Sequence, residues 1–278
     1  MKRYRLLLLG LFAALALTGC APSGWAPSPT PEPTPASLPA ETLSPPSLAL
    51  PTPSPAPSLE PSPEPEEGSY FDNVLFVGDS IMEGIRQYVA VQRQEGELLG
   101  TAQFLTTTMG VSLADLVGDR DNGVQFSYQG EERPLEDIVS DIAPRRVFLL
   151  LGLNDLASDQ DPVITDIVDR YIRLIDSLQT ACPGVECIII TNPPKVASQW
   201  LPDYTANQHF GNPLIQELVD GLTQMCRENN IPYVDAYECL KNENGVLPDD
   251  YCRDGYIHLN HQGAAVVVEA LEAFAEGR

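Results

Sequence analysis

The chain has 278 residues, of which 43% are hydrophobic and 20% are charged, and its formal net charge at pH 7 is −23. A chain this acidic is not expected to bind nucleic acid, because that affinity comes largely from basic side chains on phosphates. The 26 prolines are distributed unevenly. Their distribution and the charge pattern divide the chain into three parts: residues 1–20, 21–68 and 69–278.

Residues 1–20 are typical of a secretory signal peptide, with three basic residues before an apolar run and small residues before Cys20. This apolar run is shorter than a permanent transmembrane helix requires. The ending Leu17-Thr18-Gly19-Cys20 resembles the bacterial lipobox, which implies that Cys20 becomes a lipidated N-terminus. Lipid chains bury methylenes at about 0.8 kcal/mol each. We therefore expect an extracytoplasmic protein anchored to the membrane through Cys20; the alternative is a plain signal peptide with an incidental cysteine.

Residues 21–68 have the composition of a linker. Ser, Thr, Pro, Ala and Glu dominate, and sixteen of the 26 prolines fall here. Such a segment buries too little apolar surface to offset its ordering entropy, so we expect it to be disordered. Proline-rich chain extends by about 3.1 Å per residue, so the linker can hold a domain on the order of 100 Å from the membrane.

Residues 69–278 are long enough for one packed domain, with thirteen basic and thirty-three acidic residues. Apolar runs predict strands at residues 74–77, 102–107, 146–151, 187–191 and 232–235. Helical spacing of apolar residues predicts helices at residues 81–93, 134–142, 163–180, 213–228 and 261–274, the last with Asn260 as its N-cap.

The alternation of these elements predicts an α/β fold with a doubly wound, mainly parallel five-stranded sheet flanked by helices. The strand predicted at residues 146–151 is apolar almost throughout, as expected of a parallel strand buried on both faces. Residues 123–130 are predicted to form a small hairpin outside this sheet. We find no zinc-ligand spacing and no phosphate-binding glycine loop, so no metal or cofactor is expected.

Four chemically informative segments follow predicted strands or precede the last helix. They contain Ser80 in Gly-Asp-Ser, Gly110, Asn154 in Gly-Leu-Asn-Asp, and His258. A doubly wound sheet gathers such segments at the carboxyl ends of its strands, where ligands bind. A hydroxyl, a glycine N–H, a carboxamide and an imidazole are the groups that acyl transfer needs.

The four blocks, in this order and at this spacing, resemble those of the SGNH (GDSL-type) hydrolases, which have a flavodoxin-like fold. The resemblance implies that Ser80 is the nucleophile and that His258 is the general base and then the general acid. It also implies an oxyanion hole made by the backbone N–H groups of Ser80 and Gly110 and the side chain of Asn154. Asp79 and Asp155 are expected to be structural. For Gly110, a left-handed backbone conformation is the alternative explanation.

The last block departs from the family pattern. The family has an aspartate three residues before the histidine, where this chain has Gly255, whereas Asp254 lies four residues before it. We predict that Asp254 is the triad acid, which requires a bulge of one residue. Asp249 or Asp250 are alternatives, and so is a backbone carbonyl that orients the imidazole of a Ser–His dyad.

Residues 193–212 form a long connection, which suggests a functional loop. We predict that Trp200 and Tyr204 in this loop bind substrate; the alternative is a loop packed by its own aromatics. The export signal permits disulfides, and sequence proximity suggests Cys182–Cys187 and Cys239–Cys252 bridges, with Cys226 left as a free thiol.

The predicted function is that of a cell-surface serine esterase that hydrolyses or transfers short acyl esters. The substrate suited to this location is an O-acetyl group on peptidoglycan or another polysaccharide. Its partners would be an acylated carbohydrate or a small ester, together with the membrane at Cys20. A lipase or lysophospholipase of the same family, and a glycan-binding pseudoenzyme without turnover, are the alternatives.

Overall fold

The computed structural model describes residues 68–107, 110–120, 124–158, 162–196 and 211–278. Its main sheet has five strands in the order β2-β1-β5-β6-β7, and every neighbouring pair is parallel. The strands are β1 (Val74–Gly78), β2 (Gln103–Thr106), β5 (Arg146–Leu150), β6 (Glu186–Ile190) and β7 (Tyr233–Val234). The predicted α/β fold with a five-stranded parallel sheet is confirmed. Residues 1–67, with Cys20 and all but the last residue of the predicted linker, lie outside the described residues.

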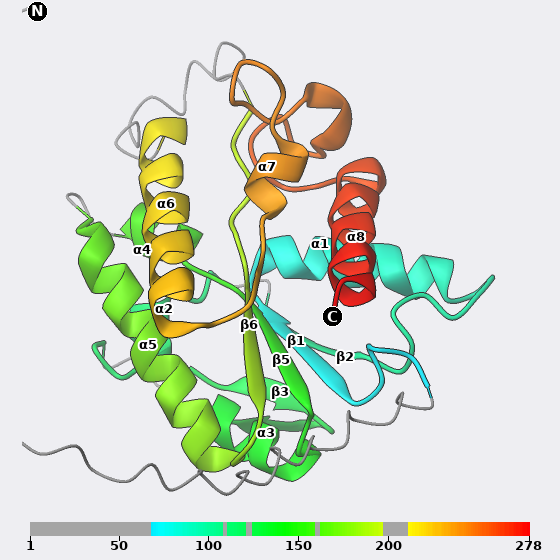
Figure 1. The fold of residues 1–278 in the computed structure, drawn as a ribbon, viewed down its shortest axis with the longest axis vertical. Helices are drawn as coiled ribbons and strands as arrows, with labels where there is room; N and C mark the ends of the chain where they lie inside the picture. Colours follow the sequence, from blue (N-terminus) through cyan, green and yellow to red (C-terminus); the bar gives the residue numbers. More distant parts are fainter. Residues whose placement is uncertain (1–67, 108–109, 121–123, 159–161, 197–210) are drawn as a thin grey trace, which may run out of the picture. The chain divides into compact units, whose positions relative to one another are not determined.

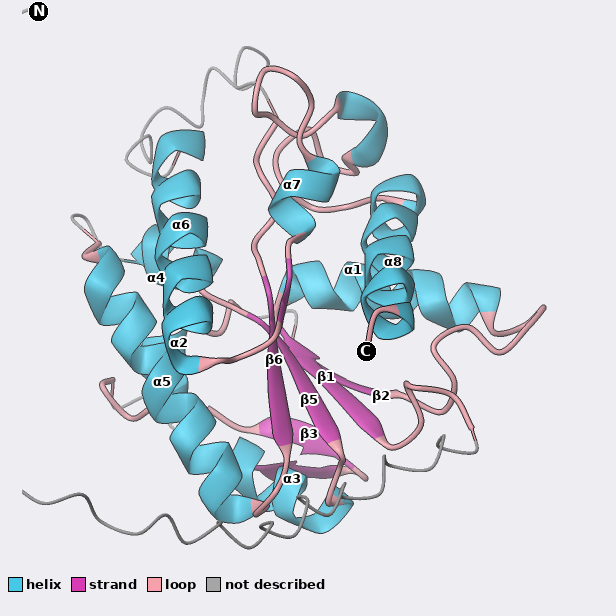
Figure 2. Ribbon diagram, viewed as in Figure 1, coloured by secondary structure: helices cyan, strands magenta, loops and turns pink. Residues whose placement is uncertain are grey.

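Helices cover both faces of the sheet. They are α1 (Ser80–Gln92), α2 (Leu113–Leu116), α3 (Leu135–Ile142), α4 (Leu153–Ser158), α5 (Ile164–Ala181), α6 (Asn212–Asn229), α7 (Ala236–Leu240) and α8 (His261–Glu276), with a 3₁₀ turn, η3, at Asp249–Tyr251. Helices α5 and α6 pack together on one side of the sheet, and α1 and α8 pack together on the other (Figures 1 and 2). Among the described helices, none combines the length and apolar character required to cross a membrane.

The centre of the sheet is held by stacked aromatic rings. Phe76 of β1 pairs in register with Phe104 of β2 and Phe148 of β5. Because parallel strands in register place these side chains on one face, the Phe76 ring stacks on both neighbours, at centroid distances of 4.8 and 4.7 Å. Strand β1 is buried along its whole length. Burial on both faces explains why its sequence is continuously apolar and does not alternate.

Three short helices, α2, α4 and α7, were not predicted, because four to six residues are too few for an apolar period to show. The predicted hairpin exists but lies further along the chain, with β3 (Phe126–Tyr128) antiparallel to β4 (Glu131–Arg133). Gln129 and Gly130 have φ angles of 54° and 85°, so they form the turn itself. Gly130 is therefore at the centre of the hairpin and not at its end.

The two predicted disulfides are absent from the structure. All five cysteines of the described residues are free thiols. Cys252 Sγ instead lies 3.3 Å from Asp254 Oδ1, and Cys187 is buried in the core. Proximity in sequence was therefore the wrong guide to disulfide pairing. Cys226 is a buried free thiol, as predicted.

Candidate active site

Ser80 is the first residue of α1 and lies directly beyond the carboxyl end of β1. The turn is tight: a Cβ on Gly78 would come within 2.5 Å of Met82 Cβ and 2.8 Å of the Leu150 carbonyl oxygen. Only glycine fits there. Asp79 is the N-cap of α1, and its Oδ1 accepts a hydrogen bond from the Ile81 N–H at 2.9 Å. The Gly-Asp-Ser sequence thus fixes the hydroxyl of Ser80 at the start of the helix.

The side chains of Ser80, His258 and Asp254 form a continuous chain, although 178 residues separate the first two along the sequence. His258 Nε2 lies 3.0 Å from Ser80 Oγ, and His258 Nδ1 lies 2.5 Å from Asp254 Oδ2. A carboxylate only accepts hydrogen bonds, so Nδ1 carries the proton and Nε2 is left to accept from the Ser80 hydroxyl. This is the tautomer that a general base requires.

Gly255 makes the bulge that the shifted aspartate requires. Its φ angle is +70°, in the left-handed region where glycine is favoured. The turn brings Asp254 Oδ1 within hydrogen-bond distance of three successive N–H groups, those of residues 256, 257 and 258, at 2.9, 3.1 and 3.2 Å. The same carboxylate reaches back to His258 with its second oxygen. The contact to His258 Nδ1 is therefore made by Asp254 and not by Asp249, Asp250 or a backbone carbonyl.

These contacts determine the charge of Asp254. Partial burial by itself would raise the pKa of this carboxyl, but hydrogen bonds from His258, the Tyr256 N–H and the Cys252 thiol hold its pKa well below the ordinary value. Asp254 is consequently a carboxylate at neutral pH. The His258 and Asp254 side chains remain 28% and 34% exposed, so the pair is accessible from solvent.

Asn154 lies in the first turn of α4, beyond the end of β5, with its amide beside the serine turn. Its Nδ2 donates to Asp79 Oδ2 at 2.8 Å and to the Val111 carbonyl oxygen at 3.0 Å. Asp79 therefore has two structural roles, because one oxygen caps α1 and the other orients the Asn154 amide. The amide joins the segment after β1 to the segment after β2.

Asp79 is almost completely buried, at 2% exposure. Burial raises its pKa to about 6, with a smaller contribution from Asp155, while the Ile81 N–H and His258 oppose the shift. Because the pKa in the folded state lies above the unfolded value, the folded protein binds the proton more tightly. The resulting stabilisation is complete below about pH 4 and is lost as the pH rises through about 6.

We therefore expect the free energy of unfolding of the wild type, relative to that of Asp79→Asn, to fall by about 2 kcal/mol between pH 4 and pH 7. Denaturant unfolding of both proteins at several pH values measures this difference, and the titration of groups that do not interact with Asp79 cancels in it. A difference that does not change with pH would contradict the raised pKa.

Gly110 is exposed and lies against Asn154. A Cβ at this position would come within 2.6 Å of Asn154 Oδ1 and 3.2 Å of Asn154 Cγ. Gly110 is not among the described residues with positive φ. Close approach to the Asn154 amide, and not a left-handed conformation, is thus the reason that glycine occupies this position.

Gly110→Ala is expected to displace the Asn154 amide and to lower kcat by about 10-fold to 100-fold with little change in KM, because small misplacements of groups in a reacting constellation are costly. Steady-state hydrolysis of p-nitrophenyl acetate measures the effect. Gly96→Ala is the matched control, since a Cβ on Gly96 meets nothing within 4 Å. Equal rates for the two variants would show that the Gly110 contact is unimportant.

Two predicted substrate-binding residues, Trp200 and Tyr204, lie outside the described residues. The contact of Cys252 with the carboxylate of Asp254 was not predicted, because a cysteine near an aspartate has no motif. Within the described residues, no group of three or more His, Cys, Asp or Glu side chains is arranged to hold a metal ion.

Comparisons with known proteins agree with the observed fold. The model of the GDSL-like Lipase/Acylhydrolase family matches residues 76–266. No curated protein matches the chain. Among solved structures, a protein from Streptococcus pneumonia has 22% identity and a TM-score of 0.53, covering 73% of this chain and 83% of that one.

Two further structures have the same fold. A GDSL-like lipase from Bacteroides thetaiotaomicron has 17% identity and a TM-score of 0.53, covering 73% of this chain and 87% of that one. A lipase/acylhydrolase from Enterococcus faecalis has 16% identity and a TM-score of 0.50, covering 74% and 96%. The fold and the family match together define a carboxylic ester hydrolase. The chain belongs to the GDSL-like lipase/acylhydrolase (SGNH) family.

Proposed function

We propose that the protein is a cell-surface serine esterase that removes short acyl groups, with O-acetyl groups on peptidoglycan or another polysaccharide as its substrate. The observation that carries the proposal is the unbroken chain from Asp254 through His258 to Ser80, with contacts of 2.5 and 3.0 Å. Family membership supplies the reaction class, which is ester hydrolysis. No metal or cofactor is required for this chemistry.

In the proposed reaction, Ser80 Oγ attacks the ester carbonyl carbon while its proton passes to His258 Nε2. The tetrahedral intermediate then expels the alcohol, which takes the proton from His258 and leaves an acyl group on Ser80. Water attacks the acyl-enzyme with His258 again as the base, and the acid product leaves. Asp254 stabilises the imidazolium that forms in each half of the reaction.

The oxyanion would be stabilised by the backbone N–H groups of Ser80 and Gly110 and by Asn154 Nδ2. In the structure both Nδ2 protons already have acceptors, Asp79 Oδ2 and the Val111 carbonyl. The charged oxyanion would compete with the neutral Val111 carbonyl for one of them, and charge-assisted hydrogen bonds are the stronger ones. The bond to Asp79 would keep the amide aligned during this exchange.

Two features favour an ester carried on a large polymer. The solvent exposure of His258 and Asp254 suits a substrate that approaches from outside. The predicted signal peptide ending at Cys20 and the linker at residues 21–68 would hold the domain within reach of cell-wall glycans. We propose that Trp200 and Tyr204 contribute apolar rings that suit a sugar face.

Anchoring is tested separately from catalysis. The full-length chain expressed in a bacterium should partition with membranes, and Cys20→Ala should release it or block its maturation. Intact-mass measurement of the mature wild type should show acyl chains on Cys20. A mature protein cut elsewhere and free of lipid would overturn the anchor and leave the esterase proposal unaffected.

The substrate class is tested with residues 69–278 or the full chain on p-nitrophenyl esters of increasing length and on O-acetylated peptidoglycan. We expect rapid acetate release that a serine-reactive fluorophosphonate inhibits, and no release from glycan that has been de-O-acetylated beforehand. Strong preference for long acyl chains would overturn this substrate class in favour of a lipase. Glycan binding without any turnover would overturn the enzymatic proposal.

A further inference from the structure

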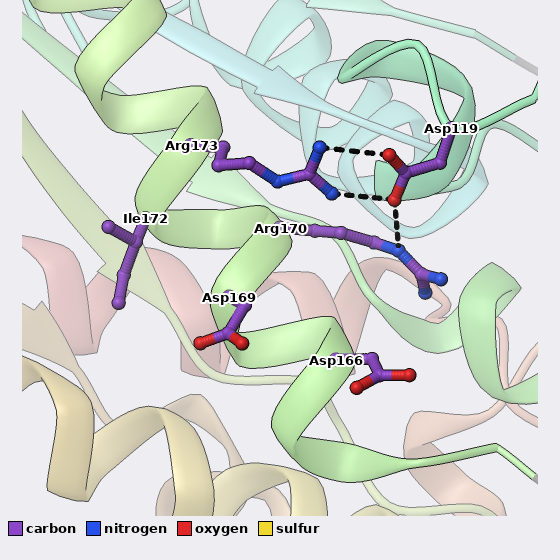
Figure 3. A pocket seen from close by; sticks show the side chains of 6 residues that line it. All are labelled: Asp119, Asp166, Asp169, Arg170, Ile172 and Arg173. Atoms are coloured by element: carbon purple, nitrogen blue, oxygen red, sulfur yellow. Dashed lines mark hydrogen bonds and ion pairs between the residues drawn. The ribbon is translucent and has the colours of Figure 1, made fainter.

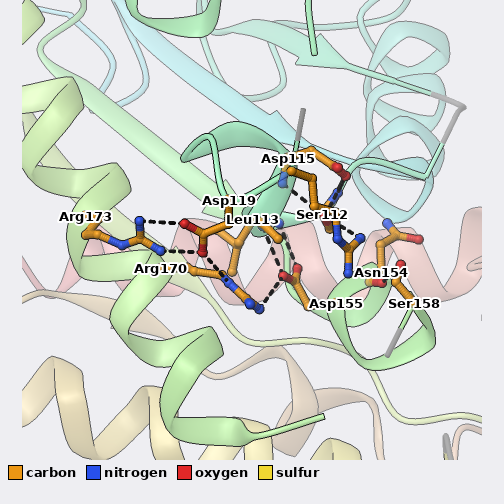
Figure 4. A network of polar contacts seen from close by, with 11 residues as sticks. Ser112, Leu113, Asp115, Asp119, Asn154, Asp155, Ser158, Arg170 and Arg173 are labelled. Atoms are coloured by element: carbon orange, nitrogen blue, oxygen red, sulfur yellow. Dashed lines mark hydrogen bonds and ion pairs between the residues drawn. The ribbon is translucent and has the colours of Figure 1, made fainter. Parts of the chain in front are cut away.

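A buried charge lies next to Asn154 and is not used in the reaction. The Asp155 side chain has no exposed surface. One of its oxygens accepts from the Leu113 N–H at 2.7 Å, and the other accepts from the Ala114 N–H at 3.2 Å (Figure 4). Asp155 on α4 thereby holds the first turn of α2, which belongs to a different part of the chain.

Arg170 of α5 completes this arrangement. Its Nη1 lies 3.3 Å from Asp155 Oδ1, and its Nε lies 3.0 Å from Asp119 Oδ2. The Arg170 side chain is only 15% exposed. Burial raises the pKa of Asp155, whereas the Leu113 and Ala114 N–H groups and the guanidinium groups of Arg170 and Arg120 oppose that shift. Arg170 is thus a cation in direct contact with a carboxylate that is cut off from water.

Arg173, one turn further along α5, shares only part of this environment. It forms a two-pronged contact with Asp119, at 2.8 and 2.6 Å, and its side chain is 48% exposed. Figure 3 shows the two arginines reaching the same carboxylate of Asp119. The structure gives Arg173 no contact with Asp155. The two arginines therefore differ in whether they touch the buried carboxylate.

The position of α2 matters because the segment before it carries two partners of the proposed oxyanion site. Gly110 lies against the Asn154 amide, and the carbonyl of Val111 accepts from Asn154 Nδ2. The N-cap of α2 is Ser112, which forms a reciprocal capping box with Asp115. Asp155 accepts hydrogen bonds from the two N–H groups immediately after this cap, and it is also the neighbour of Asn154 in the sequence. A shift of Asp155 would therefore move the Gly110 segment relative to the Asn154 amide.

We propose that Arg170 is a positioning residue that acts through Asp155 to hold Gly110 and Asn154 in the geometry that stabilises the oxyanion. This proposal rests on the proposed esterase function. Removal of the Arg170 guanidinium takes away a cation in contact with the buried Asp155 carboxylate, and breaking a buried ion pair in this way is strongly unfavourable. The local structure would relax by letting Asp155 move toward water. The N–H groups of Leu113 and Ala114 would then lose their acceptor, and the oxyanion segment would move with them.

The test compares Arg170→Met with Arg173→Met in the folded enzyme. Both substitutions remove one positive charge from the same helix and one partner from Asp119, but only the first removes a partner from Asp155. With p-nitrophenyl acetate, we expect Arg170→Met to lower kcat by about 10-fold to 100-fold with KM nearly unchanged. Arg173→Met should stay within about 2-fold of the wild type, as expected for a surface ion pair.

A second measurement separates positioning from loss of folded protein. Phenylboronic acid forms a tetrahedral adduct with an active serine, and calorimetry gives its Kd and its stoichiometry independently. We expect Arg170→Met to weaken the Kd by about 10-fold or more with unchanged stoichiometry. A merely structural role would lower the stoichiometry or the Tm and leave the Kd of the folded fraction unchanged, and this outcome would overturn the proposal.

Arg170→Lys keeps a positive charge on a flexible side chain at the same position, and it is the variant to test if Arg170→Met does not fold. A single ammonium cannot reproduce the contacts of Nη1 and Nε to two carboxylates, so we expect a smaller loss in kcat and in boronate affinity. Wild-type kinetics for Arg170→Lys, or equal kinetics for Arg170→Met and Arg173→Met, would overturn the role of Arg170 alone. Absence of Ser80-dependent hydrolysis in the wild type would instead overturn the proposed function, and the Arg170 proposal with it.

Discussion

Replacing Ser80 with alanine is expected to lower kcat for p-nitrophenyl acetate by on the order of 10⁵-fold or more, because the Ser80 hydroxyl carries the acyl group in the proposed mechanism. The hydroxyl is held 3.0 Å from His258 Nε2 at the start of α1. Alanine preserves the helix start, since the cap is made by Asp79 and not by Ser80. The loss should therefore occur without a change in Tm.

The comparison that makes this result specific is a set of histidine variants. His258→Ala should cost about as much as Ser80→Ala, and the double variant should be no slower than either, because residues that act as a unit are not additive. His261→Ala is the matched control: this histidine begins α8 and meets Tyr88 edge-on at 5.9 Å. Independent, additive losses for Ser80 and His258 would contradict a shared mechanism.

The positions of Ser80 and His258 in the fold could be predicted from the sequence because local signals mark both segments. Strand β1 is a buried apolar run, and Gly78, Asp79 and Ser80 follow it directly, so the position of Ser80 depends only on local structure. His258 could be placed because Asn260 caps the next helix, accepting from the N–H groups of Gln262 and Gly263. A strand end and a helix cap are strong local signals, so these residues converge as the fold requires.

The second layer of the site could not be predicted. The hydrogen bond from Asn154 to Asp79 joins residues 75 positions apart, and no local pattern indicates it. The sequence predicted Gly110 as an oxyanion donor near Asn154, but it did not show that a Cβ at this position would collide with the Asn154 amide. Arg170 lies on the polar side of a long helix rich in charges, where a surface ion pair is the ordinary expectation. The proposed positioning role of Arg170 depends on the burial of Asp155, which the sequence does not reveal.

The shifted aspartate, Asp254, was predicted in part from the sequence and in part only from the structure. The sequence shows that Asp254 is one residue too early for the family pattern, and it shows that Gly255 follows. It does not show which carboxylate reaches His258. In the structure, Gly255 has a left-handed φ of +70°, and the bulge at this residue accommodates the extra position between Asp254 and His258. The glycine that displaces the aspartate also provides the bulge that restores its contact.

Asp254→Asn is expected to lower kcat by up to about 10⁴-fold, because it would reverse the tautomer of His258. Asp254 Oδ1 accepts from three backbone N–H groups, so the amide oxygen of asparagine would keep that place and its NH₂ would face His258 Nδ1. Nδ1 would then have to accept a hydrogen bond, and the ring proton would move to Nε2. A protonated Nε2 cannot take the proton of Ser80.

Asp250→Asn is the matched control, because it makes the same chemical change in the preceding turn. There the contact with Asn260 is made by the backbone carbonyl of Asp250, which the substitution keeps. Steady-state kinetics on p-nitrophenyl acetate should leave Asp250→Asn near wild type, and a near-normal kcat for Asp254→Asn would remove Asp254 from the proposed triad.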